Sequence, residues 1–202
     1  MTPQRIVILG NAGSGKSSLA RVLAQQLSLP VVHLDCLYWG AGWVKPGRKA
    51  FRQRVANATD GPAWICEGNY HHQTFDLRLP KADLVIWMDT PRLTCARRVA
   101  LRALRQGPRA DLPDGCAEKL DRDFFAFLGY VWRFDRVYRP AIEALRHVHG
   151  PDVPVIRLRD RRQADAFATG LGPADRRLSR FWPSMPLPPA VRGEAYKAPS
   201  TR

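Results

Sequence analysis

At 202 residues the chain has the length of one domain with a complete hydrophobic core, and its 45% of hydrophobic residues is typical of a globular protein. Its 32 lysine and arginine residues exceed its 18 aspartate and glutamate residues, which gives a formal net charge of +14. This charge favours anionic partners, including nucleotides and non-specifically bound nucleic acid, although a basic solvated surface is the simpler alternative. No apolar run approaches the length that crosses a membrane, so we expect no membrane partner.

The use of cysteine is typical of a protein from a reducing compartment. The four cysteines form no Cys-x-x-Cys pair, which argues against a zinc site, and nothing in their spacing suggests a disulfide framework. They are Cys36, Cys66, Cys95 and Cys116. No signal peptide precedes the first apolar segment, so we expect a cytoplasmic protein.

Residues 10–17 carry the most specific motif of the chain. Their sequence, Gly-Asn-Ala-Gly-Ser-Gly-Lys-Ser, fits the pattern G-x-x-x-x-G-K-[ST] of the phosphate-binding P-loop. An apolar, β-branched segment at 5–9 predicts a buried strand before the loop, and an apolar stripe at 18–27 predicts a helix after it. An accidental glycine-rich turn is the alternative, but strand, loop and helix have the register that a P-loop requires.

The motif also predicts how ATP and Mg²⁺ bind. Glycine lacks a Cβ atom, so the backbone can curl and direct its N–H groups inward, where the positive end of the following helix also points. Lys16 would reach the β- and γ-phosphates, and the Ser17 hydroxyl would bind Mg²⁺. The predicted ATP-binding residues are Gly10, Asn11, Ala12, Gly13, Ser14, Gly15, Lys16, Ser17 and Ser18.

A second apolar segment, at 31–34, predicts a strand that ends at Asp35. Because ligands of open α/β sheets bind at the carboxyl ends of the strands, Asp35 could orient Mg²⁺ through water or act as a base on an acceptor hydroxyl. A simple turn or cap residue is the alternative. We interpret His33 as a partly buried, hydrogen-bonded side chain rather than a catalytic one.

The next segment, at 36–46, is a loop rich in aromatic residues. Tyr38, Trp39 and Trp43 either form a pocket that stacks on the ring of an acceptor or only cover the hydrophobic core, because both residue types serve both purposes. A helix is predicted over 46–58, with its proline in the first turn.

Two acids compete for the role of the Walker B carboxylate, which supports Mg²⁺ beside a P-loop. Glu67 follows an apolar strand predicted at 63–66, and Asp89 follows another at 83–88. We favour Glu67, because Asp89 and the Thr-Pro pair after it are also typical of a turn that leads into a helix.

Several arginines are candidates for contacts with phosphate. In a helix predicted over 92–106, Arg98, Arg102 and Arg105 share one face, where they would stabilise the transferring phosphoryl group. A solvated basic face is the alternative. Arg78 lies in a short polar segment and would either contact an acceptor phosphate or be solvated.

The loop after the arginine-rich helix, at about 107–117, is interpreted as a lid that excludes water when it closes. A long helical region follows over 117–147. We expect it to bend near Gly129 and to be interrupted around Pro140.

The last predicted elements are a strand at 153–158 and a short helix that ends at about 170. They complete a P-loop kinase-like domain over 1–171. Residues 172–202 are rich in proline and show no periodicity, so we interpret them as a flexible tail.

With these elements the chain resembles the P-loop nucleoside and nucleotide kinases of the adenylate kinase type. It more closely resembles the bacterial group labelled adenylate-kinase-related or "DNA topology modulation protein". The likeness spans about residues 4–170. It depends on the P-loop and on the sequences His33-Leu34-Asp35 with Tyr38-Trp39 and Gly42-Trp43, Glu67-Gly68-Asn69-Tyr70, Asp76-Leu77-Arg78-Leu79 and Val131-Trp132-Arg133-Phe134.

The resemblance implies a three-layer α/β P-loop NTPase fold, with a five-stranded parallel sheet of order 2-3-1-4-5, helices on both faces and a small lid. It implies ATP and Mg²⁺ as cofactors, with Lys16 and the arginines beside the lid placed around the γ-phosphate. Glu67 stands where such proteins more often carry aspartate. No DNA-reading motif in the sequence accounts for the group's DNA-related label.

We therefore predict an ATP-dependent kinase that moves the γ-phosphate of ATP to a small-molecule acceptor, with nucleosides and nucleotides as candidates. Its predicted metal ligands are Ser17 and Glu67. Its predicted catalytic residues are Lys16, Asp35, Arg98 and Arg102. Two alternatives stay open: a nucleic-acid-associated ATP-binding protein or ATPase that uses its basic surface, and a nucleotide sensor that closes on ATP without chemistry.

Overall fold

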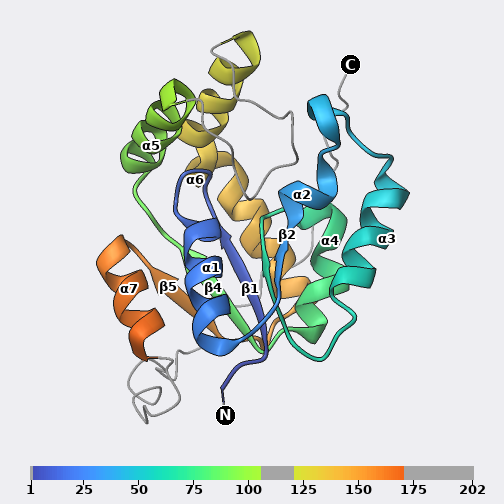
Figure 1. The fold of residues 1–202 in the computed structure, drawn as a ribbon. Coiled ribbons are helices and arrows are strands. Elements are labelled where there is room, and N and C mark those ends of the chain that lie inside the picture. The colour runs from blue at the N-terminus through green and yellow to red at the C-terminus, as the bar shows by residue number, and fades with distance from the viewer. Residues whose placement is uncertain (1, 106–120, 171–202) are drawn as a thin grey trace.

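A computed structural model describes residues 2–105 and 121–170 of the chain (Figure 1). Its strands are β1 (Arg5–Gly10), β2 (Val31–His33), β3 (Trp64–Glu67), β4 (Leu84–Met88) and β5 (Val155–Leu158). Its α-helices are α1 (Lys16–Leu27), α2 (Leu34–Tyr38), α3 (Arg48–Ala58), α4 (His71–Arg78), α5 (Arg92–Arg105), α6 (Arg122–His149) and α7 (Arg161–Gly170). Two short 3₁₀ helices are η1 (Ala41–Trp43) and η2 (Leu79–Lys81). The predicted lid and the predicted tail lie outside the described residues.

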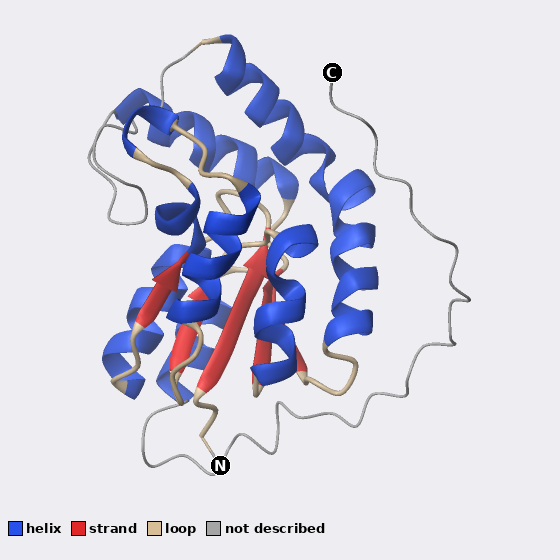
Figure 2. Cartoon of the chain, turned by 90° about the vertical axis from the view of Figure 1, so that its right-hand side faces the viewer, coloured by secondary structure: helices blue, strands red, loops and turns tan. Residues whose placement is uncertain are grey.

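The strands form one parallel sheet in the order β2-β3-β1-β4-β5, which confirms the predicted fold class and strand order. Helices α1 and α7 pack on one face of the sheet, and α3, α4 and α6 pack on the other (Figures 1 and 2). This is the three-layer arrangement expected when parallel strands are joined by helical crossovers. Because β1 is the central strand, the loop after it opens at the middle of the carboxyl edge, where such sheets bind ligands.

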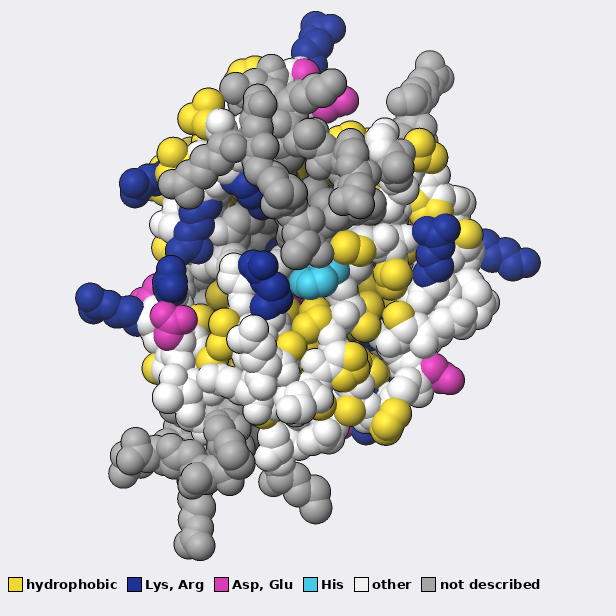
Figure 3. All heavy atoms as spheres, in the orientation of Figure 1, with side chains coloured by type: hydrophobic (Ala, Val, Ile, Leu, Met, Phe, Trp, Pro, Cys, Tyr) yellow, Lys and Arg dark blue, Asp and Glu magenta, His cyan; other side chains and the backbone are white. Residues whose placement is uncertain are grey.

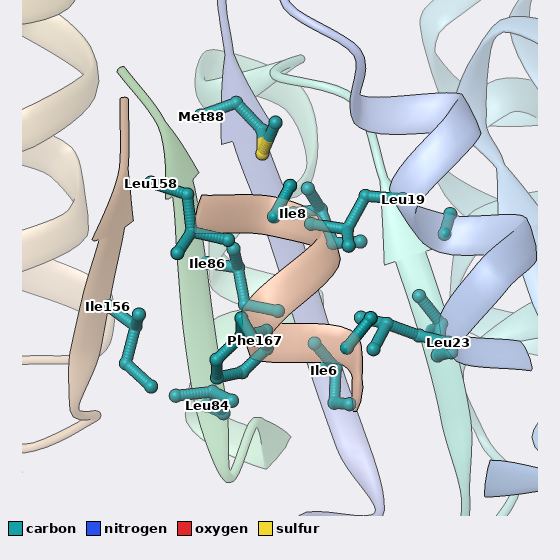
Figure 4. Packing of buried hydrophobic residues seen from close by; sticks show 14 of the residues in the cluster. Ile6, Ile8, Leu19, Leu23, Leu84, Ile86, Met88, Ile156, Leu158 and Phe167 are labelled. Carbon is teal, nitrogen blue, oxygen red and sulfur yellow. The ribbon is translucent and has the colours of Figure 1, made fainter. Parts of the chain in front are cut away.

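The residues of β1 explain why it lies at the centre. Ile6 and Ile8 belong to the core beneath α1 and α7, and Val7 and Leu9 belong to the core on the opposite face. None of the four side chains is exposed to solvent. Figure 4 shows the first pair packed with residues of α1, β4, β5 and α7. A strand that is covered on both faces has an uninterrupted apolar sequence, as residues 6–9 do.

One predicted boundary was wrong, and one helix was not predicted, on the β2 and β3 side of the sheet. The strand expected at 31–34 ends at His33, because Leu34 begins the short helix α2 and is fully buried. The short polar segment around Arg78, where no helix was predicted, forms helix α4, which packs against α3 and α6. Both helices are short, so their apolar periodicity in the sequence is weak.

The expected interruption around Pro140 is also wrong, because α6 continues through it over 28 residues. Proline removes one backbone hydrogen bond of a helix and crowds the preceding turn. Here Pro140 itself is exposed, while Phe134 and Ile142 on either side of it are buried in the core. Tertiary packing on both sides of the proline therefore holds the helix together across it.

None of the described helices is both long and apolar enough to span a membrane. On the face drawn in Figure 3, lysine and arginine side chains occur in several separate places among the described residues rather than in one continuous patch.

Candidate active site

The P-loop joins the carboxyl end of β1 to the start of α1, with Gly15 as the residue that caps the helix. Gly10, Gly13 and Gly15 have φ values of +140°, +76° and +104°, which favour glycine. A Cβ atom at Gly10 would lie 2.6 Å from the carbonyl oxygen of Met88. The curled backbone expected of a phosphate-binding loop is therefore present. All three glycines suit its conformation, and Gly10 is also required for space.

The glycines of the loop should differ in their tolerance of alanine. A Cβ atom at Gly13 would lie 2.6 Å from the backbone oxygen of Cys95, whereas one at Gly15 would meet nothing closer than 3.7 Å. Both substitutions strain a positive φ, so Gly15→Ala should lower the free energy of unfolding by about 1 kcal/mol and Gly13→Ala by at least about 2 kcal/mol more. Urea unfolding of the two variants measures this difference. Equal losses would show that α5 moves aside freely.

Hydrogen bonds with three other segments hold the loop in place: the connection after β3, the connection after β4, and α6. The N–H of Gly10 donates to Asn69 Oδ1 at 3.1 Å, and Asn69 Nδ2 donates back to the Gly10 carbonyl at 2.9 Å. Thr90 Oγ1 donates to the Ser14 carbonyl at 3.0 Å, and Asn11 Nδ2 donates to the carbonyl of Val131 in α6 at 2.8 Å. These hydrogen bonds tie the backbone of the loop to segments that are distant from it in the sequence.

Lys16 is the first residue of α1, and its side chain folds back over the loop. Its Nζ atom donates to the carbonyl of Asn11 at 3.0 Å. The ammonium group is thus held at the P-loop, at the helix end where backbone N–H groups favour an anion. This is the position that the motif predicts for the lysine that binds phosphate.

Glu67 at the end of β3 lies beside Ser17. The Ser17 hydroxyl donates to Glu67 Oε1 at 2.9 Å, and His33 Nδ1 lies 2.8 Å from the same oxygen. The parallel register places His33 of β2 directly opposite Glu67, which explains their contact. His33 is therefore partly buried and hydrogen-bonded, as predicted.

The carboxyl group of Glu67 is almost completely buried, yet it is held in its ionised form. Burial alone would raise its pKa, but the hydrogen bond from His33 and the charge of Lys16 together lower it below the usual value. A carboxylate beside a serine hydroxyl at the end of a P-loop suits Mg²⁺, which prefers oxygen ligands and is bound by few protein groups when a nucleotide supplies the rest. Within 2–105 and 121–170 there is no cluster of three or more His, Cys, Asp or Glu residues that could hold a metal ion by itself.

Asp89, the competing acid, lies in a different environment. It forms a bidentate ion pair with Arg139 of α6, with distances of 2.6 and 3.4 Å. Arg139 also bonds Glu143, so the side chain of Asp89 belongs to a network between β4 and α6. The structure thus brings Glu67, and not Asp89, into contact with Ser17.

The arginines of α5 lie beside the loop. Arg98 Nη1 lies 3.3 Å from the carbonyl oxygens of both Gly13 and Ser14 and donates to them. Arg102 lies one helical turn further along α5 and is partly buried. Arg98 therefore contacts the P-loop, and its role in catalysis stays a prediction. The side chain of Arg105 lies outside the described residues.

Arg78 is neither solvated nor available to an acceptor phosphate, so both sequence interpretations were wrong. It is fully buried, where it donates to the carbonyl oxygen of Gly68 at 2.7 Å, to that of Asn69, and to Thr74 Oγ1 at 3.1 Å. Burial lowers its pKa from the usual value. Its role is therefore to hold the connection between β3 and α4.

Asp35 lies in the first turn of α2, immediately after β2. Tyr70 Oη donates to Asp35 Oδ1 at 2.6 Å. Burial and the Asp35 carboxylate together raise the pKa of Tyr70, so this phenol stays protonated and remains a donor. Sequence reasoning did not assign a role to Asn69 or Tyr70, although both follow a buried strand at the ligand-binding edge of the sheet, which is the signal that could have found them.

The structure shows one of the two predicted uses of the aromatic loop, which is to cover the core. The ring of Tyr38 packs against the buried ring of Phe51, with centroids 5.0 Å apart, and so covers the core. Trp39 and Trp43 pack edge to face with centroids 5.1 Å apart, and Trp43 remains 37% exposed. The ring of Trp39 also lies against Lys45, whose Nζ atom is 5.5 Å from the ring centroid. Stacking of these rings on an acceptor stays a prediction.

Comparison with known proteins supports the assignment of the loop. The model of the "ATPase family associated with various cellular activities (AAA)" matches residues 6–66, which contain most of β1, the P-loop and α1. This is less than half of the chain. No curated protein sequence matches the chain significantly.

Among solved structures, a shikimate kinase from Acinetobacter baumannii in complex with shikimate aligns with a TM-score of 0.51 and 18% identity, over 83% of this chain and 90% of the other. A shikimate kinase from Bacteroides thetaiotaomicron aligns with the same TM-score and 14% identity, over 83% of this chain and 95% of the other. The protein has a P-loop kinase fold. At this level of identity the likeness establishes the fold and does not identify the substrate.

Proposed function

We propose that the protein is a kinase that transfers the γ-phosphoryl group of ATP to a hydroxyl group of a small molecule. The observation that carries the proposal is the contact between Ser17 and Glu67 at a glycine-curled P-loop, with Lys16 held over the same loop. These are the groups that a P-loop enzyme needs to bind the triphosphate and its metal.

One group of residues binds ATP, the phosphoryl donor, and another binds the molecule that accepts the phosphoryl group. The backbone N–H groups of the loop and Lys16 bind the phosphates, and Ser17 with Glu67 would hold Mg²⁺. Mg²⁺, when bound, supplies positive charge that neutralises the phosphoryl oxygens. Arg98 and Arg102 stabilise the charge that develops during transfer.

On the acceptor side, Asp35 orients the hydroxyl group or takes its proton. The acceptor oxygen forms a bond to the γ-phosphorus while the bond from that phosphorus to the bridging oxygen breaks, and ADP leaves with the bridging oxygen. The acceptor proton passes to Asp35. Trp39 and Trp43, which flank this region, favour an acceptor with a planar ring, and nucleosides and nucleotides meet that requirement.

The test is transfer of label from γ-labelled ATP in the presence of Mg²⁺. The protein is incubated with separate pools of nucleosides, nucleotides and ring hydroxy acids, and the compound that gains phosphate is identified by mass. Label on an acceptor supports the proposal. Release of inorganic phosphate only, or no turnover with any pool, contradicts it and favours the ATPase or the nucleotide sensor.

The alternative of a nucleic-acid-associated ATPase stays a prediction that depends on the net charge. It requires duplex binding that weakens steeply with salt and ATP hydrolysis that duplex DNA stimulates. Adding duplex DNA to the same assay at two ionic strengths tests it directly.

A further inference from the structure

The connection between β3 and α4 reaches both halves of the candidate site with neighbouring residues. The side-chain amide of Asn69 forms two hydrogen bonds with the backbone of Gly10 in the P-loop, at 3.1 and 2.9 Å. The hydroxyl of Tyr70, the next residue, donates to Asp35 at 2.6 Å. Adjacent side chains thus contact the nucleotide loop on one side and the predicted acceptor carboxylate on the other.

The same connection packs directly against the helix that carries Asp35. Gly68 has a φ of +123°, and a Cβ atom there would lie 3.0 Å from Cβ of Leu34, the residue before Asp35. Tyr70 adopts a φ of +37°, which is disfavoured for a residue with a side chain. Glycine adopts the positive φ of residue 68 without strain, whereas the strained backbone of Tyr70 persists only when its surroundings hold it there.

Arg78 supplies that support. Its guanidinium group donates to the carbonyl oxygens of both Gly68 and Asn69, and it lies over the ring of Phe75 at 5.0 Å. Within the described residues Arg78 donates to Thr74, to Cys66 Sγ and to the two carbonyl oxygens, and to no carboxylate. Burying a guanidinium group is costly unless it is hydrogen-bonded, and here the carbonyl oxygens of residues 68 and 69 accept its hydrogen bonds.

We propose that residues 68–70, held by Arg78, form a positioning element that couples the nucleotide loop to Asp35. Asn69 and Tyr70 are positioning residues, because they act through Gly10 and Asp35 and touch no reacting atom. The inference rests on the proposed function, in which the P-loop binds ATP and Asp35 meets the acceptor. When ATP orders Gly10, the two hydrogen bonds to Asn69 order the connection, and the hydroxyl of Tyr70 then orders Asp35.

The experiment compares Asn69→Ala and Tyr70→Phe with the wild-type protein. Asn57→Ala is the matched control, since Asn57 is an exposed asparagine in α3 whose side chain bonds Gln53. Two quantities are measured with Mg²⁺ and ATP: the ATP affinity by calorimetry, and the nucleotide-induced slowing of amide hydrogen exchange over residues 34–38. Thermal unfolding of each variant verifies that it is folded.

In the wild-type protein, ATP should slow exchange over residues 34–38. Asn69→Ala should weaken ATP binding about tenfold, because it removes two hydrogen bonds from the loop, and should abolish the slowing even at saturating ATP. Tyr70→Phe should leave ATP affinity unchanged and still abolish the slowing. A merely structural role for either residue would lower stability without separating these two readouts.

Several outcomes would overturn the inference. One is that both variants bind ATP as the wild type does and show the same slowing over residues 34–38. Another is that the wild-type protein binds ATP without any slowing there, which leaves the proposed function intact. If Asn69→Ala does not fold, Tyr70→Phe decides alone, because it removes a single oxygen atom. Failure of the wild-type protein to bind ATP at all would instead contradict the proposed function.

Discussion

Lys16→Ala is expected to reduce phosphoryl transfer at least about 100-fold, and to leave the fold intact. The ammonium group of Lys16 lies over the P-loop, where it donates to the carbonyl of Asn11 at 3.0 Å. It is the one lysine that the motif places at the β- and γ-phosphates, where charge develops during transfer. Helix α1 is anchored by Leu19, Ala20 and Leu23, so the substitution removes no core contact.

The measurement is the rate of ATP turnover with and without acceptor, together with circular dichroism and the unfolding midpoint. Lys49→Ala is the control, because Lys49 is an exposed residue of α3 and its loss changes the net charge by the same amount. Unchanged turnover in Lys16→Ala would rule out the P-loop as the place of reaction. Equal losses in both variants would indicate a general effect of charge.

Glu67→Gln is expected to lower the transfer rate about 10- to 100-fold and to raise the Mg²⁺ concentration needed for half-maximal activity. Glutamine has nearly the same volume and can still accept a hydrogen bond from Ser17, so the geometry of the site is conserved while the negative charge is lost. Because the pKa of Glu67 is lowered, the wild-type carboxyl group is ionised at neutral pH, and the substitution removes a negative charge. Titration of activity with Mg²⁺ at fixed ATP measures the effect.

Asp89→Asn is the matched control for this prediction. It weakens the ion pair with Arg139, which should lower the free energy of unfolding by about 1 to 3 kcal/mol. The Mg²⁺ requirement should stay at the wild-type value, because the side chain of Asp89 is directed to α6 and not to Ser17. The reverse result, with a changed Mg²⁺ requirement only in Asp89→Asn, would assign the metal to Asp89.

The sequence by itself determined the sheet and the P-loop. Each strand is a short apolar run whose signal is local, and the strand order was implied by a resemblance that depends on contiguous motifs. The P-loop occupies consecutive residues, so the glycines that curl the backbone and the lysine that binds phosphate can be recognised without knowing what surrounds them.

Tertiary structure alone decided what the isolated polar residues do. Glu67 and Asp89 both follow apolar strands in the sequence. The strand register sets His33 opposite Glu67, and the packing of α6 brings Arg139 to Asp89, so the two acids have different partners. Arg78 is the last residue of α4, and its buried guanidinium group reaches back to the carbonyl oxygen of Asn69, before that helix begins. Asn69 meets Gly10 across 59 positions of the chain. The partner of a polar side chain depends on contacts distant in sequence, and the local pattern around that side chain does not encode them.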